Sequence, residues 1–217
     1  MSAAAALIAL PISAIVIWAL LRSPLAHRRL MAHPTGERWS EHPTPTFGGI
    51  GIFLGLAAGI VAAVGIGGFA GRKELLGVLA GAALLFLAGL IDDIYALPAW
   101  VKLGAQFGAA AIALVMGLSV EIVSNDFLAA VLGLLWLVGM TNAFNLLDNM
   151  DGLAATLATV ACGYFAIDAA AVHDSTLVMI LSLALGFACV GFLPYNLRAG
   201  GAAVFMGDAG SQLLGFT

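Results

Sequence analysis

Asp92 and Asp93 are the first of several acidic groups that stand out in a sequence with few charges, and they directly follow the apolar residues 88–91. An ionisable side chain at the end of a hydrophobic helix is costly unless it meets water, a cation or a hydrogen-bond donor. The pair therefore suggests a functional site. The alternative is that it only marks a helix end, but negative charge at a helix C-terminus is disfavoured by the helix dipole.

A second polar group lies in residues 141–152, where Asn142, Asn145, Asp148 and Asp151 recur at every third position. Positions three apart are neighbours on a helix, so Asn145, Asp148 and Asp151 are predicted to form one polar strip. An amide and two carboxylates on one strip are hard oxygen donors, suited to Mg²⁺ or to sugar hydroxyls. A solvated loop is the alternative, because Asn, Asp and Gly are common in turns.

Two further segments carry weaker signals. Asp208 lies between glycines in residues 205–211, where backbone amides can approach a ligand and a helix N-terminus attracts phosphate. Residues 43–49 are rich in proline and follow Arg38 and His42, two basic groups suited to an anionic ligand. A helix cap is the alternative for the first segment, and a plain helix entry for the second.

The bilayer is the expected solvent for the elements that hold these groups. Of the 217 residues, 62% are hydrophobic and 9% are charged, whereas soluble domains are about half apolar and a quarter charged. A net charge of −4 provides no basic face, so nucleic acid is not an expected partner. Cys162 and Cys189 lie in apolar runs without metal-ligand or disulfide spacing, which argues against redox chemistry.

The apolar runs predict an all-α, polytopic transmembrane helix bundle, a single integral membrane domain over residues 1–217. Seven complete spans are expected at residues 3–21, 47–68, 75–91, 103–118, 128–143, 153–172 and 176–194, and the start of an eighth near Ser211. If the spans alternate, the side that holds the acidic groups carries six basic residues against two on the other side: Arg22, Arg28, Arg29, Arg38, Lys102 and Arg198 against Arg72 and Lys73. The positive-inside rule then places the acidic groups in the cytoplasm and the N-terminus outside.

Acidic groups on one face of a helical bundle suit an enzyme that acts on a lipid. Paired acids with Mg²⁺ would neutralise a transferring phosphate, and the bundle would supply a groove for the lipid chain. An ion-coupled transporter is the alternative from another class. Its acids are expected near the bilayer midplane, in helices repeated between two halves of the chain, and the sequence shows no convincing repeat.

Residues 92–106, 142–155 and 195–196 with 205–211 resemble, in this order, motifs of the polyprenyl-phosphate N-acetylhexosamine-1-phosphate transferases (glycosyltransferase family 4). This family includes the bacterial phospho-N-acetylmuramoyl-pentapeptide transferase and the undecaprenyl-phosphate GlcNAc-1-phosphate transferases. The resemblance implies that the chain is a C-terminally truncated part of an inner-membrane enzyme with ten or eleven spans. It also implies Mg²⁺-dependent transfer of a sugar 1-phosphate from a UDP-sugar to undecaprenyl phosphate, with release of UMP.

Carried over to this chain, the resemblance makes Asp208 the principal Mg²⁺ ligand, places Asn145 near the metal, and makes Asp92 and Asp93 the acids that handle the phosphates. Lys102 would hold phosphates or acids of the site. These assignments make Asp92, Asp93 and Asp208 the expected catalytic residues.

The resemblance assigns the remaining candidate residues to substrate binding. Asn145, Asp148 and Asp151 would line the nucleotide pocket, and Arg38 and His42 are the candidate cations before the proline-rich segment. Asn149 stands where many members have Gly, a form similar to GlcNAc-1-phosphate transferases, so GlcNAc is favoured and phospho-MurNAc-pentapeptide is the alternative. The expected partners are undecaprenyl phosphate, a UDP-N-acetylhexosamine and membrane lipid, and a homodimer is left open.

Overall fold

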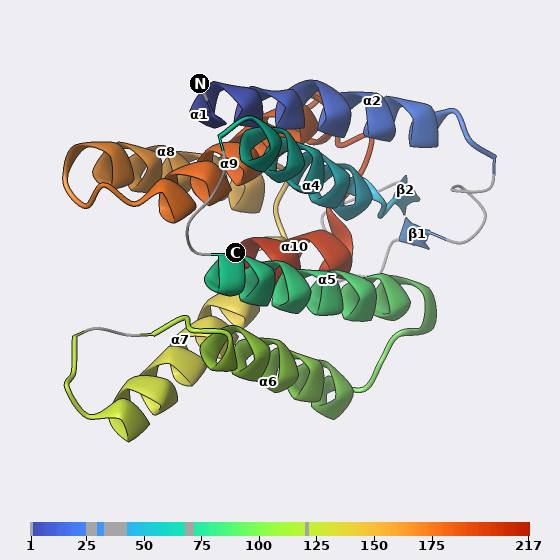
Figure 1. Cartoon of the computed structure of the whole chain (residues 1–217). Helices are drawn as coiled ribbons and strands as arrows, with labels where there is room; N and C mark the ends of the chain where they lie inside the picture. Colours follow the sequence, from blue (N-terminus) through green and yellow to red (C-terminus); the bar gives the residue numbers. More distant parts are fainter. Residues whose placement is uncertain (1, 25–29, 33–42, 68–71, 120–121) are drawn as a thin grey trace.

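The structure of the chain, a computed structural model, describes residues 2–24, 30–32, 43–67, 72–119 and 122–217. Figure 1 shows a bundle of helices, to which two short strands are attached. Strand β1 Met31–Ala32 pairs antiparallel with β2 Thr44–Pro45. The predicted helical class is therefore confirmed. Arg38 and His42 lie outside the described residues, so their role in substrate binding stays a prediction.

Each predicted span corresponds to one helical segment. The first consists of α1 Ser2–Ala5, the 3₁₀ helix η1 Ala6–Ile8 and α2 Ala9–Leu21. The others are α4 Gly48–Gly67, α5 Arg72–Tyr95, α6 Ala99–Val115, α7 Asp126–Leu147, α8 Leu153–Ala171, α9 Thr176–Asn196 and α10 Gly207–Phe216. Side-chain caps begin two of them: Asn125 accepts the Leu128 N–H at the start of α7, and Ser175 accepts the Val178 N–H at the start of α9.

Among the described residues, five helices, α4, α5, α7, α8 and α9, are long and apolar enough to cross a bilayer. Residues Ala6–Leu21 and helix α6 are apolar but shorter. At a rise of 1.5 Å per residue, α6 extends about 25 Å, less than the roughly 30 Å of a hydrocarbon core. The chain is thus a multi-pass membrane protein, and the count of seven complete spans stays a prediction.

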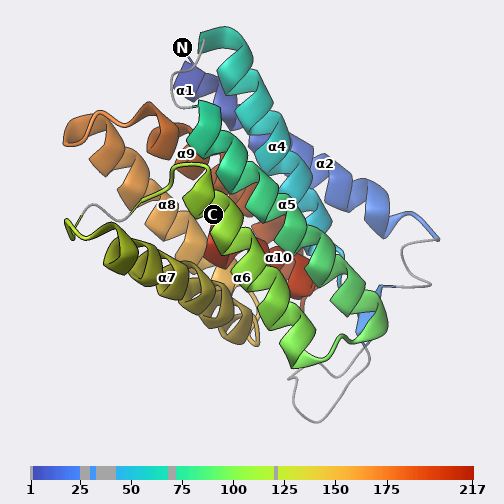
Figure 2. The same ribbon diagram turned by 60° about the horizontal axis from the view of Figure 1, so that its bottom comes forward.

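Helix α10 lies between two groups of helices (Figure 1). One group contains α2, α4, α8 and α9, and the other contains α5, α6 and α7. Helix α10 packs against α4 of the first group and against α5 and α7 of the second, and its central place is also visible in Figure 2. The start of α10 is therefore held from both groups: the Gly49 N–H of α4 donates to the Met206 carbonyl, and Asp93 of α5 accepts the Asp208 N–H.

Small side chains allow the helices to approach closely. Ala9, Ala184 and Ala188 are fully buried where α2, α4 and α9 meet, which is the packing expected of helices in lipid. The large exposed side chains, such as Trp136, Phe165 and Ile167, lie on the outside of the bundle. Such an apolar exterior is the reverse of a soluble helical protein and agrees with the composition.

Candidate active site

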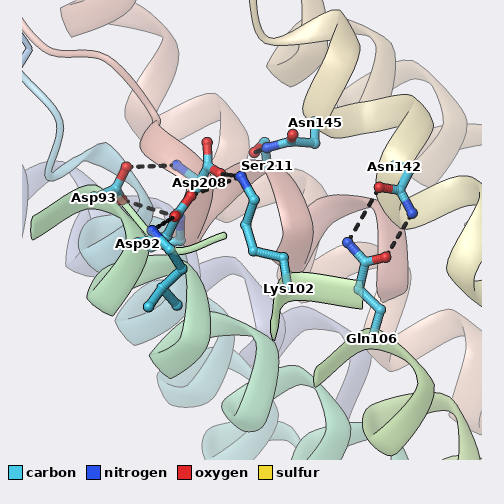
Figure 3. Close-up of polar contacts among 10 residues, drawn as sticks. Asp92, Asp93, Lys102, Gln106, Asn142, Asn145, Asp208 and Ser211 are labelled. Atoms are coloured by element: carbon cyan, nitrogen blue, oxygen red, sulfur yellow. Dashed lines mark hydrogen bonds and ion pairs between the residues drawn. The ribbon is translucent and has the colours of Figure 1, made fainter. Parts of the chain in front are cut away.

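Three charged side chains from three helices meet at one point (Figure 3). The Lys102 ammonium lies 2.9 Å from Asp92 Oδ2 and 2.9 Å from Asp208 Oδ2. Asp92 comes from the last turns of α5, Lys102 from the first turn of α6, and Asp208 from the first turn of α10. The three side chains are 9%, 27% and 18% exposed, so the cluster is accessible from outside the bundle while most of its surface is covered.

The turn between α5 and α6 brings Lys102 back towards Asp92. Asp92 Oδ1 accepts a hydrogen bond of 2.6 Å from the Leu97 N–H, inside this turn. Pro98 then takes the N-cap position of α6, where its fixed φ and missing N–H are tolerated. Asp92 therefore does two things: one carboxylate oxygen holds the turn, and the other pairs with Lys102.

Asp93 caps helix α10. Its two carboxylate oxygens accept the backbone N–H groups of Asp208, at 2.9 Å, and Ala209, at 3.2 Å. The pair was predicted to end the helix, but α5 continues to Tyr95, so Asp92 and Asp93 lie in its last turn. The unfavourable position of Asp93 near the C-terminus of α5 is offset by its favourable position at the N-terminus of α10.

This cap also explains where α10 begins. The expected start was near Ser211, but the helix starts at Gly207, about one turn earlier. The capped amides of Asp208 and Ala209 allow the additional turn to form, because the first N–H groups of a helix have no partner inside it. Asp208 is thus part of a helix and not of a preceding loop.

Asn145 reaches α10 one turn further along. Its Nδ2 donates a 2.9 Å hydrogen bond to Ser211 Oγ, and its amide also contacts the Asp208 carboxylate. Sequence reasoning named Ser211 only as the start of an apolar run. Because α10 begins at Gly207, Ser211 lies three positions after Asp208 and on the same face of the helix. This spacing in the sequence could have identified Ser211 as a neighbour of the site.

The prediction of one helical strip through Asn145, Asp148 and Asp151 was wrong. Helix α7 ends at Leu147, Asp148 is its C-cap, and a turn leads to Gly152, whose φ of +72° favours glycine. The Asp151 carboxylate accepts the Ala202 N–H, at 3.2 Å, in the segment between α9 and α10. The turn-forming residues of this segment end the helix despite the three-residue spacing of the polar side chains. Asp148 and Asp151 therefore do not share a helix face with Asn145.

Asn196 is a second residue whose role sequence reasoning missed. Its Oδ1 accepts the Gly152 N–H at 2.5 Å, and its Nδ2 donates to the Val204 carbonyl at 2.9 Å. The side chain is only 4% exposed. Asn196 therefore fastens the α7–α8 turn to the segment that leads into α10, two elements that both carry candidate site residues.

The oxygen donors at the cluster fit a magnesium ion. Within the described part of the chain, no three Asp, Glu, His or Cys side chains stand close enough to form a metal site by themselves. Mg²⁺, however, is usually held by one or two carboxylates and completed by water and substrate phosphates. Asp208 and Asp92 provide two such carboxylates around a point that the Lys102 ammonium now neutralises.

The sequence pattern of glycosyl transferase family 4 matches residues 75–217, well over half of the chain, and this region contains the whole cluster. The chain belongs to this family. The resemblance noted from the motifs alone is therefore confirmed, and the family match includes α10, on which Asp208 lies.

Three similar proteins come from bacteria. A probable undecaprenyl-phosphate N-acetylglucosaminyl 1-phosphate transferase of Bacillus subtilis is 35% identical over 193 residues, which cover 85% of this chain and 52% of the relative. Decaprenyl-phosphate N-acetylglucosaminephosphotransferase of Mycobacterium leprae is 32% identical over 214 residues, with 88% and 53% covered. Phospho-N-acetylmuramoyl-pentapeptide-transferase of Lacticaseibacillus paracasei is 38% identical over 205 residues, with 83% and 61% covered. The chain spans about half the length of the first two relatives.

Proposed function

We propose that the protein transfers an N-acetylhexosamine 1-phosphate from a UDP-sugar to a polyprenyl phosphate, in a Mg²⁺-dependent reaction that releases UMP. The observation that carries this proposal is the pairing of Lys102 with Asp92 and Asp208, a charged cluster at the end of an apolar bundle. The names of the relatives, which include undecaprenyl-phosphate and decaprenyl-phosphate transferases, support the same reaction class.

Each side chain of the cluster has a separate part in this proposal. Asp208 and Asp92 would hold the ion, and the Asn145 oxygen could join them after the amide rotates, because its nitrogen now faces Ser211. Bound Mg²⁺ would supply positive charge that offsets the charge of the transferring phosphates. Lys102 adds a further positive charge at the same point, and Asp93 holds the N-terminus of α10 so that Asp208 stays in place.

The transfer is proposed as a single displacement. An oxygen of the lipid phosphate attacks the β-phosphorus of the UDP-sugar, the bond from that phosphorus to the bridging oxygen breaks, and UMP leaves with the electron pair. A phosphate monoester with a second pKa of about 6 is largely dianionic at neutral pH, so a strong base adds little. The carboxylate oxygens of Asp92 and Asp93 already accept hydrogen bonds, which suits residues that orient groups rather than attack.

The proposal also places the site at the cytoplasmic face of the inner membrane, with the N-terminus outside. The end of α5, the start of α6, the end of α7 and the start of α10 meet at the cluster, as the alternation of spans predicts. Arg22, at the end of α2, stacks 3.9 Å from the Trp18 ring centre, and Trp and Arg are typical anchors at a membrane interface.

A UMP-release assay tests the proposed function. The full-length protein in detergent is given Mg²⁺, undecaprenyl phosphate and either UDP-GlcNAc or UDP-MurNAc-pentapeptide. We expect UMP and a lipid-linked sugar with UDP-GlcNAc and loss of both after chelation of Mg²⁺. Turnover with UDP-MurNAc-pentapeptide instead would support the alternative activity, that of a phospho-N-acetylmuramoyl-pentapeptide transferase, which is the name of the Lacticaseibacillus relative. Failure with both donors, or UMP release without lipid, would refute the proposal.

Gly89 offers a test of how closely α10 must approach α5. A Cβ atom at this position would come within 2.5 Å of the backbone carbonyl of Asp208. We expect Gly89→Ala to push the first turn of α10 away and to lower kcat by about tenfold or more. Gly104→Ala is the matched control, because nothing lies within 4 Å of a Cβ there. Equal UMP-release rates for the two variants would contradict the prediction.

A further inference from the structure

A pair of side-chain amides joins helices α6 and α7 beside the cluster (Figure 3). Asn142 Nδ2 donates a 2.6 Å hydrogen bond to Gln106 Oε1, and Gln106 Nε2 lies 3.4 Å from Asn142 Oδ1. Asn142 Nδ2 also donates to the Val138 carbonyl at 2.8 Å. We call this pair the amide bridge. Gln106 is only 4% exposed, so its amide has exchanged water for the partner on α7.

The amide bridge stands one helical turn from two residues of the site. Gln106 follows Lys102 by four positions on α6, and Asn142 precedes Asn145 by three positions on α7, so each pair shares one face of its helix. Lys102 contacts Asp208, and Asn145 contacts Ser211, on successive turns of α10. The two helices thus deliver one side chain each to α10, and the amide bridge ties these helices together just beyond that point.

A small shift of α6 along α7 would separate the site contacts. One residue of register moves a side chain by 1.5 Å along the helix and by about 100° around it, which is enough to break contacts of 2.9 Å. Apart from Gln106, the buried residues of α6 are Ala109, Ala110 and Ala113, whose small apolar side chains do not by themselves select one register. The polar pair does, because any other register would leave the buried Gln106 amide without its partner on α7.

We propose that Gln106 and Asn142 are positioning residues for the transfer reaction: the amide bridge sets the register of α6 against α7 and so places Lys102 and Asn145 around Asp208. Neither amide touches the reacting groups in this account. The inference rests on the proposed function, since it assigns a task to the residues of that same site.

The test compares variants of the full-length protein in the UMP-release assay with UDP-GlcNAc, undecaprenyl phosphate and Mg²⁺. Gln106→Leu and Asn142→Leu each break the amide bridge. We expect each to lower kcat by about tenfold with KM for UDP-GlcNAc changed less than about twofold. The double variant should lose little more than one single variant, because the two residues act as a unit.

Thr141→Val is the matched control for lost polarity on α7. Thr141 is fully buried next to Asn142, and its hydroxyl donates 2.7 Å to the Leu137 carbonyl of its own helix. We expect this variant to keep kcat within about twofold of the wild type. The double variant Gln106→Asn with Asn142→Gln keeps the combined side-chain length. It should recover at least half of the kcat that is lost in the Gln106→Asn or Asn142→Gln variant alone.

Melting temperatures in detergent distinguish positioning from general stability. Losses of kcat that Thr141→Val shares, or that follow the melting temperature across all variants, would overturn the inference. Losses in the double variant equal to the product of the two single losses would overturn it as well. If the wild-type protein releases no UMP, the proposed function itself is refuted, an outcome that is visible before any variant is compared.

Discussion

Asp208→Asn is expected to lower kcat for UMP release by about a thousandfold or more, because the charge at this position both pairs with Lys102 and would hold Mg²⁺. Asparagine has nearly the same volume, and the backbone N–H of residue 208 can still donate to Asp93. The start of α10 should therefore remain folded. A thousandfold loss corresponds to about 4 kcal/mol of transition-state stabilisation.

The matched control for Asp208 is Asp126→Asn. Asp126 also lies in the first turn of a helix, at the start of α7, but its side chain is exposed and outside the cluster. This variant should keep kcat within about twofold. Binding of Mn²⁺, followed by its electron paramagnetic resonance signal as a substitute for Mg²⁺, should weaken in Asp208→Asn alone. Wild-type turnover and Mn²⁺ binding in Asp208→Asn would remove Asp208 from the site.

Lys102→Met is expected to lower kcat by about a hundredfold, because the variant removes the positive charge that lies 2.9 Å from two carboxylates. Removal of the Lys102 ammonium should also strengthen the binding of Mg²⁺, since the ammonium no longer competes for Asp92 and Asp208. The Mg²⁺ concentration for half-maximal rate should therefore fall although the rate itself is lower. A lower rate together with tighter Mg²⁺ binding is the result expected if Lys102 and the metal share the carboxylates of Asp92 and Asp208.

Two further variants serve as controls for Lys102→Met. Lys73→Met removes a lysine from the first turn of α5, at the other end of that helix, and should leave both quantities unchanged. Lys102→Arg keeps the charge and should recover part of the rate. A higher Mg²⁺ requirement in Lys102→Met would show that the lysine helps to bind the metal instead of competing with it.

Much of the fold was visible in the sequence because lipid-facing helices are apolar along their whole length. All seven predicted spans overlap observed helical segments, and the alternation of spans correctly grouped Asp92, Lys102 and Asp208 at one end of the bundle. Helix ends were less predictable, because they depend on contacts from elsewhere in the chain. The first turn of α10 forms on a cap from Asp93, 115 residues earlier.

The site contacts that were missed all join distant parts of the chain. Gln106 meets Asn142, Asn145 meets Ser211, and Gly152 meets Asn196. None of these pairs has a local spacing that identifies the partner. The threefold spacing of Asn145, Asp148 and Asp151 was the opposite case, a local pattern that predicted a helix where the structure has a turn.

The cap on α10 has a consequence for inhibitor chemistry. Helix N-termini often recruit phosphate groups through their free amides, but here the amides of Asp208 and Ala209 already donate to Asp93. A phosphate-mimicking compound would have to displace a carboxylate of the protein to reach these donors. A compound that carries an amine would instead compete with the Lys102 ammonium for the carboxylates of Asp92 and Asp208. An inhibitor of this site must therefore replace a contact that the protein already makes, the one from Asp93 for an anionic group or the one from Lys102 for a basic group.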